Sequence, residues 1–142
     1  MKTDPKTTTV GTIDDEILAF TAGKDIVLDL QLVEADCIGS AAHAIMLSKM
    51  PVDPPVLTEA EAAQVCAELA RIREAGAKGE FVIRPEDQDV HLAVERTLTE
   101  TLGDVGKKIH TGRSRNDQVA VDLRLFAKSQ LLELMSEASD LA

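Results

Sequence analysis

Hydrophobic positions recur at helical spacing along most of this 142-residue chain. Between Asp25 and Ser48, for example, apolar residues return every three or four positions, which is the period of one face of an α-helix. By the same criterion we expect helices over residues 14–22, 25–48, 59–75, 88–102 and from about 116 onward. The pattern contains no credible pair of strands and no internal repeat, so it predicts an all-α fold.

Capping and stop signals support these boundaries. Residues 58–61 (TEAE) have the pattern of a capping box, in which a threonine hydroxyl and a glutamate three residues later satisfy free N–H groups at a helix start. Gly76 and Gly103 are expected to end the two helices that follow. The final helix has no such stop before Ala142 and is apolar on much of its circumference, which is typical of a helix inside a bundle. It predicts an exposed apolar patch and a chain that is part of a longer protein.

Composition narrows the class of protein. Hydrophobic residues make up 44% of the chain and aromatic residues 2%, which suits helices packed through aliphatic side chains. The formal net charge of −10 argues against nucleic-acid binding, which needs a basic surface and aromatic stacking platforms. No apolar run is long enough to span a membrane, and the polar residues 1–13 are expected to form a flexible arm, not a secretion signal. Cys37 and Cys66 form no CxxC pair and are expected to be buried thiols, so we expect a cytoplasmic protein.

A basic segment stands out against this acidic background. An even spread of the 15 Lys and Arg residues would place about one of them in any nine positions, yet residues 107–115 hold four. Gly112 lets a ligand approach the backbone closely. The segment leads into a helix for which Ser114, Asn116 and Asp117 are good N-caps. Free N–H groups at a helix start carry partial positive charge, and an arginine grips a carboxylate through two parallel hydrogen bonds. The residues indicate a site for a small anion; the alternative is a solvated basic turn with an ordinary cap.

Two histidines lie on predicted helices. Asp87, His91 and Glu95 are spaced i, i+4, i+8 on one helix face, a spacing that could bind a metal ion. The alternatives for His91 are a polar active-site role and a surface or interface position beside these acids. His43 lies in the apolar stretch SAAHAIML and is expected to be a satisfied core or interface histidine.

The basic segment and its flanks resemble a known family. HTGRSRNDQ, residues 110–118, is similar almost letter for letter to the signature of the argininosuccinate lyases, in the fumarase/aspartase superfamily. Residues 86–109 resemble the helix and turn that precede this signature, and residues 20–47 resemble the family's first long helix. The resemblance covers about residues 14–142.

The resemblance implies an organisation and a reaction. It divides the chain into a small helical N-terminal lyase domain, residues 14–112, and the truncated start of a central helical-bundle domain, residues 113–142. The implied reaction is the reversible β-elimination of argininosuccinate to L-arginine and fumarate in arginine biosynthesis. The full-length enzyme is expected to be a cytoplasmic homotetramer without metal or organic cofactor, in which three subunits build each active site. The family's proton-transfer residues lie in two later motifs, so we expect no catalytic residue in this chain and no activity from it alone.

The resemblance also implies which residues bind the substrate. Ser114, Arg115 and Asn116 resemble the substrate-binding segment at the head of a core helix. His91 resembles the histidine that helps to hold the succinyl end. Arg113, the other arginine of this segment that could grip a carboxylate, is a further candidate.

One position departs from the family pattern. Many members have a substrate-contacting serine where this chain has Gly23, which is followed by a two-residue insertion, Lys24 and Asp25. The backbone N–H of Gly23 or the Lys24 side chain is then expected to replace the missing hydroxyl.

Three other functions fit the same residues. The chain could belong to a non-catalytic relative of the crystallin kind, or to a sister lyase that releases fumarate from another substrate, such as adenylosuccinate. It could also be a stand-alone helical interaction module. The segment HTGRSRNDQ favours the argininosuccinate branch.

Overall fold

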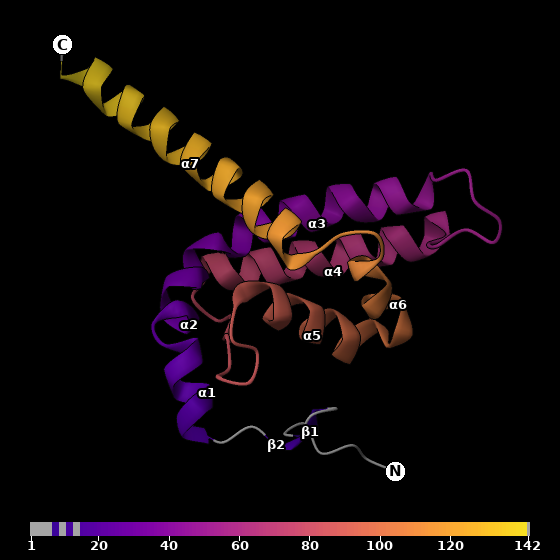
Figure 1. Ribbon diagram of the computed structural model, residues 1–142. Helices are drawn as coiled ribbons and strands as arrows, with labels where there is room; N and C mark the ends of the chain where they lie inside the picture. The colour runs from indigo at the N-terminus through magenta and orange to yellow at the C-terminus, as the bar shows by residue number, and fades with distance from the viewer. Residues whose placement is uncertain (1–6, 9–10, 13–14, 142) are drawn as a thin grey trace.

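The computed structural model describes residues 7–8, 11–12 and 15–141, and helices dominate this part of the chain (Figure 1). The all-α class predicted from the sequence is thereby confirmed. In chain order the helical elements are α1 (Asp15–Ala22), α2 (Asp25–Leu28), the 3-10 turn η1 (Asp29–Leu32), α3 (Val33–Ser48), α4 (Glu59–Ala77), α5 (Val90–Leu102), α6 (Asp104–Lys107), the 3-10 turn η2 (Lys108–His110) and α7 (Arg115–Asp140).

A very short strand pair is the exception to this helical organisation. Strand β1 (Thr7–Thr8) pairs antiparallel with β2 (Gly11–Thr12). The expectation of no strand pair is wrong at this one point, where β-branched threonines favour extended backbone. The other residues of the predicted flexible arm, 1–6, 9–10 and 13, lie outside the described residues.

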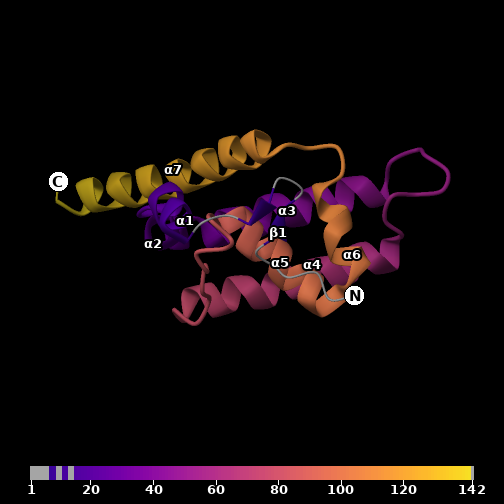
Figure 2. The same ribbon diagram turned by 60° about the horizontal axis from the view of Figure 1, so that its bottom comes forward.

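The core lies between three helices. Helices α3 and α4 run antiparallel as a hairpin, and α5 lies against the pair (Figures 1 and 2). Aliphatic side chains from all three helices meet there, as the lack of aromatic residues predicted. The fully buried members include Ala44, Leu47, Val65, Leu69 and Leu98.

Helix α7 crosses α3 with its first half and then projects away from the other helices (Figures 1 and 2). Gly39 of α3 permits the close crossing, because a Cβ at this position would lie 3.2 Å from a methyl group of Val121. Every side chain from residue 127 to residue 141 is exposed. Leu131, Leu132 and Met135 are among them, so the expected apolar patch is confirmed. None of the helices in the described ranges is long and apolar enough to cross a membrane.

The predicted helix over residues 25–48 is interrupted in the structure. The 3-10 turn η1 separates α2 from α3. The carboxylate of Asp29 in this turn accepts a hydrogen bond from the N–H of Val90 at 3.2 Å, which ties the interruption to the start of α5. That contact joins residues far apart in the sequence, so helical periodicity alone could not predict the break.

Two other predicted boundaries are shifted. Gly76 does not end α4 but lies inside it. A Cβ at this position would lie 2.8 Å from a methyl group of Val33, which explains why the residue is glycine. Gly76 is therefore a packing residue, and the helix continues to Ala77. Helix α5 begins at Val90, two residues later than predicted, because Gln88 has a positive φ of 66°. The capping box at Thr58 is confirmed.

Candidate functional site

The head of α7 is closed by its own capping box. The Ser114 hydroxyl accepts a hydrogen bond from the N–H of Asp117 at 3.3 Å, and the Asp117 carboxylate accepts one from the N–H of Ser114 at 2.8 Å. The same hydroxyl donates to the Asp117 carboxylate at 2.9 Å. These bonds hold the pKa of Asp117 below its usual value. Ser114, one of the three predicted caps, is thus the N-cap of α7, which begins at Arg115, slightly before the predicted start near Asn116, and its hydroxyl is engaged in this capping box.

Arg115 and Asn116 occupy the first turn of α7, and both are exposed. One guanidinium nitrogen of Arg115 lies 3.1 Å from the Asp89 carboxylate. Within the described residues, the other N–H groups of Arg115 and the amide of Asn116 have no protein partner. The first turn of a helix also leaves backbone N–H groups without partners inside the helix. The outer side of this helix head therefore presents several donors to solvent.

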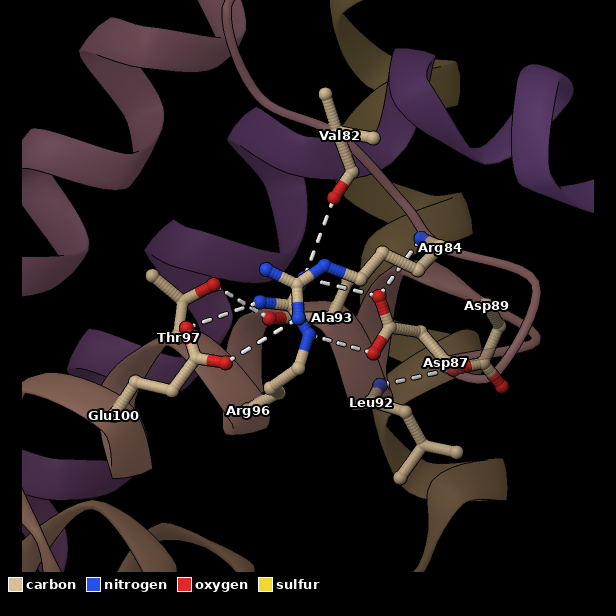
Figure 3. A network of polar contacts seen from close by, with 9 residues as sticks. All are labelled: Val82, Arg84, Asp87, Asp89, Leu92, Ala93, Arg96, Thr97 and Glu100. Atoms are coloured by element: carbon tan, nitrogen blue, oxygen red, sulfur yellow. Dashed lines mark hydrogen bonds and ion pairs between the residues drawn. The ribbon is translucent and has the colours of Figure 1, made fainter. Parts of the chain in front are cut away.

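Asp89 connects this helix head to α5. Its carboxylate caps α5 by accepting from the N–H of Leu92 at 2.9 Å, and its other oxygen binds Arg115. Figure 3 shows the network that fixes the turn before α5. Buried Asp87 accepts from the N–H of Arg84 at 2.8 Å and from Arg96 at 2.7 and 3.0 Å. The structure therefore brings Arg115 to the N-terminal end of the helix that carries His91.

His91 itself is buried beneath the helix head. Its imidazole is 5% exposed and its Nδ1 donates to the Asp36 carboxylate at 2.8 Å; the same nitrogen lies 3.5 Å from a carboxylate oxygen of Asp122. We call Asp36, His91 and Asp122 the buried triad; its members come from α3, α5 and α7. Its ligand atoms lie within 4.8 Å of one another, a spacing that a metal ion could also bridge. The hydrogen bond and the charge attraction already account for this geometry.

The metal hypothesis for residues 87, 91 and 95 is wrong. Asp87 precedes α5 and binds Arg96, so it does not share a helix face with His91. Glu95 lies 3.5 Å from the His110 ring. The acids that face His91 are instead Asp36 and Asp122, each 1% exposed. A charged residue within an apolar helical stretch was the signal in the sequence that could have revealed them.

Burial and mutual repulsion shape the acid–base properties of the triad. Burial and the neighbouring Asp36 charge raise the pKa of Asp122 to about 7. Burial lowers the pKa of His91, but the hydrogen bond and charge of Asp36 outweigh it and raise that pKa overall. One oxygen of Asp36, one of Asp122 and the amide oxygen of Gln118 are buried without a hydrogen-bond partner in the described part of the chain.

Arg113 points into the molecule. Its Nε donates to the carbonyl of Ile109 at 3.1 Å and one terminal nitrogen donates to the buried Ser40 hydroxyl at 3.0 Å. Burial lowers the pKa of this guanidinium. A small cavity of about 130 Å³ lies beside it between α3 and α7, lined by His43 and Asp117 among others. The two arginines of the segment thus face opposite ways: Arg113 inward and Arg115 outward.

His43 anchors the same segment. Its Nε2 lies 2.9 Å from the carbonyl oxygen of Thr111. A carbonyl only accepts, so Nε2 carries the proton. Burial, with help from nearby cations, lowers the pKa of His43 below its usual value, so the ring is neutral at pH 7. The expectation of a satisfied histidine is confirmed, and its partner is the basic segment itself.

The charge concentration in residues 107–115 is compensated by contacts that the sequence did not reveal. Lys107 pairs with Asp104 at 2.8 Å, and Lys108 pairs with Glu61 of α4, also at 2.8 Å. The first part of the segment is not a loop but the short elements α6 and η2. Lys107 and Lys108 are therefore paired with acids of the fold, although Lys107 stays exposed, and Arg115 is the cation in the first turn of α7.

Gly23 lies apart from these contacts. It joins α1 to α2 with a positive φ of 51°, a conformation that favours glycine, and it is exposed. Among the described residues, no hydrogen bond or ion pair links Gly23 or Lys24 to residues 106–118. The structure brings together His91, Arg115 and their neighbours, but not Gly23.

The two cysteines are free, and the predicted burial is confirmed in full for Cys37 but not for Cys66. Cys37 is buried and Cys66 is half-buried. Burial raises the pKa of the Cys37 thiol to about 12, so this thiol is unreactive.

Comparisons with known proteins give this geometry a context. Residues 12–142 match the model of a family described as lyase. The argininosuccinate lyase of Phocaeicola vulgatus is 48% identical over 129 residues, which are 91% of this chain and 28% of that protein. The argininosuccinate lyase of Crocosphaera subtropica is 44% identical over 127 residues, 89% of this chain and 26% of that protein. That of Synechococcus sp. is 50% identical over 109 residues, 77% of this chain and 22% of that protein. The chain spans little more than a quarter of the length of the first curated relatives that it matches.

Proposed function

Because the chain belongs to the lyase family whose model matches residues 12–142, we propose that it is the N-terminal part of an argininosuccinate lyase. The full-length protein then cleaves argininosuccinate to L-arginine and fumarate by reversible β-elimination. Relatives that carry this name in Phocaeicola vulgatus and Crocosphaera subtropica support the proposal.

The observation that carries the proposal is the head of α7. Arg115 and Asn116 present donors there that the fold leaves open, and Asp89 holds Arg115 at 3.1 Å beside the start of α5. A planar guanidinium with spare N–H groups can bind a carboxylate through two parallel hydrogen bonds. The helix N-terminus adds partial positive charge. A dicarboxylate such as the succinyl part of argininosuccinate fits this arrangement.

Each candidate residue has its own part in this proposal. Arg115 and the amide of Asn116 contact the substrate directly, whereas Ser114 shapes the turn by capping α7. His91 supports the site through its buried hydrogen bond to Asp36, and Arg113 supports it by binding the buried Ser40 hydroxyl. Gly23 stays a candidate for a backbone contact with the substrate.

In this reaction the donors at the start of α7 would stabilise negative charge that develops on the substrate. Removal of a proton next to a carboxylate builds negative charge on that carboxylate before the guanidino nitrogen leaves. Donors already aimed at that charge stabilise the transition state, and one such donor is worth about 3–4 kcal/mol. The elimination also needs a base and an acid. We propose that these come from segments outside this chain, so the 142 residues alone do not catalyse the reaction.

The proposal includes an organisation for the whole protein. Residues 14–112 form the N-terminal lyase domain and residues 113–142 begin the central helical bundle. The exposed leucines of α7 support a buried place for this helix in a homotetramer. The two free cysteines fit the reducing cytoplasm. No metal or organic cofactor takes part.

A substrate comparison tests this function. The full-length protein should release fumarate from argininosuccinate, followed by ultraviolet absorbance, and should cleave adenylosuccinate at least about a hundredfold less efficiently, because binding sites strongly reject substrates that leave their polar groups unpaired. The purified 142-residue chain should release no fumarate. Preferred cleavage of adenylosuccinate would support a sister lyase, and no cleavage of either substrate would support a non-catalytic relative. Fumarate release by the 142-residue chain would contradict the proposal that the base and the acid come from segments outside this chain.

A further inference from the structure

Helix α3 contacts the basic segment at two points. The sequence pattern assigned no role to Ser40 and predicted His43 only as a satisfied core or interface histidine. Ser40 accepts from Arg113 at 3.0 Å, and His43 donates to the carbonyl of Thr111 at 2.9 Å. Ser40 is 1% exposed, so its hydroxyl is not available to solvent. We propose that Ser40 and His43 are positioning residues that hold residues 109–114 in place, so that Arg115 and Asn116 face the substrate.

Helix α3 binds the turn of residues 109–114 through one of its faces. Ser40 and His43 are three residues apart, so both lie on the same face of this helix. They bind the segment on either side of Gly112, whose positive φ of 73° reverses the chain there. Arg113 closes the turn by also donating to the carbonyl of Ile109 at 3.1 Å. One side chain and one backbone carbonyl of the turn are therefore fixed to the same rigid helix.

These bonds act directly on the helix head. Thr111 lies three residues and Arg113 one residue before Ser114, the N-cap of α7. Gly112 has nothing within 4 Å of the place where a Cβ would lie, so packing does not hold the turn at that point. The two hydrogen bonds from α3 act there together with the bond from Arg113 to the carbonyl of Ile109. This role rests on the proposed function of Arg115 and Asn116, but the anchoring itself does not.

The test uses the full-length protein and two readouts. Ser40→Ala removes the acceptor for Arg113, and His43→Leu removes the donor to Thr111 at similar size. Each should raise KM for argininosuccinate about fivefold to tenfold, the effect of one lost hydrogen bond, with kcat changed less than about twofold. His43→Gln restores an N–H donor and should recover most of the loss. Ser48→Ala is the matched control, because Ser48 lies on the same helix and bonds only to Ile45 of that helix.

Trypsin provides the readout that does not depend on activity. Cleavage after Arg113 and Arg115, followed by mass spectrometry, should be faster in Ser40→Ala and His43→Leu than in the wild type or in Ser48→Ala. If the wild type does not cleave argininosuccinate, the proposed function fails and this cleavage rate alone decides on the anchoring. Unchanged KM with unchanged trypsin cleavage in both variants would overturn the inference. A loss of kcat without a rise in KM, not recovered in His43→Gln, would also overturn it.

Discussion

The buried triad and the first turn of α7, with Arg115 and Asn116, are built in contrasting ways. Asp36, His91 and Asp122 are almost fully enclosed and bind one another across three helices. Arg115 and Asn116 are exposed, and their donors point away from the fold. Buried polar groups are expensive to leave unpaired, whereas exposed ones cost little. The contrast teaches that one polar cluster maintains the structure and the other is free to bind a ligand.

The largest expected effect on stability tests this contrast directly. Asp36→Ala removes the acceptor of the His91 hydrogen bond and leaves a buried imidazole without its partner. We expect the free energy of unfolding to fall by about 3 kcal/mol, as for other broken buried pairs. Asn116→Ala, at the exposed helix head, should change it by less than about 0.5 kcal/mol. Urea denaturation of the 142-residue chain measures both, and equal losses would remove the distinction between the two regions.

A smaller effect concerns pH. Because the pKa of Asp122 is raised to about 7 in the folded state, from 3.8 for the free side chain, the folded protein binds more protons than the unfolded chain between these values. Stability should therefore fall as pH rises from about 4 to about 7. The raised pKa of His91 acts in the same direction, from its free value of 6.5 upward. The lowered pKa of Glu61, about 2, acts in the opposite direction but only below its free value of 4.5.

Asp122→Asn isolates this dependence. Between pH 5 and pH 7 the variant should lose less stability than the wild type, because the titrating buried carboxylate is gone. Thermal denaturation across this range measures the difference. Asp140→Asn, at the exposed end of α7, is the control and should follow the wild type. If the stability of Asp122→Asn and that of the wild type fell equally between pH 5 and pH 7, the raised pKa of Asp122 would be contradicted.

Local features of the fold were predictable from the sequence, because their causes lie within a few residues. The capping box predicted at Thr58 joins residues three apart and occurs in the structure. Ser114, one of the three predicted caps of the last helix, caps α7. Glycines were more ambiguous. Gly103 ends α5 as predicted, but Gly76 and Gly106 are glycines because a Cβ would meet Val33 or the backbone of α5. A packing glycine and a stop glycine look alike in a single sequence.

Contacts between helices were not predictable. The hydrogen bonds that join His91 to Asp36, Arg113 to Ser40 and His43 to Thr111 span 55, 73 and 68 residues. Helical periodicity shows which face of a helix is apolar but not which helix covers it. His91 and Arg113 were named from the sequence together with the exposed Arg115 and Asn116. Their buried partners Asp36, Asp122 and Ser40 emerged only from the fold.

The most direct test of the central claim, that the head of α7 binds the substrate, is the kcat/KM of the full-length protein for argininosuccinate. Asn116→Ala should lower it by at least about a hundredfold, the effect of removing one donor aimed at developing charge. Arg115→Lys should lower it by at least about tenfold, because an ammonium cannot form the paired hydrogen bonds of a guanidinium. Arg124→Lys, farther along the same helix, is the control. Among the described residues Arg124 binds the carbonyl of Ala120 and no other group, so kcat/KM should stay within about twofold of the wild type, as expected for surface substitutions. Near-normal kcat/KM in both Asn116→Ala and Arg115→Lys would contradict the claim.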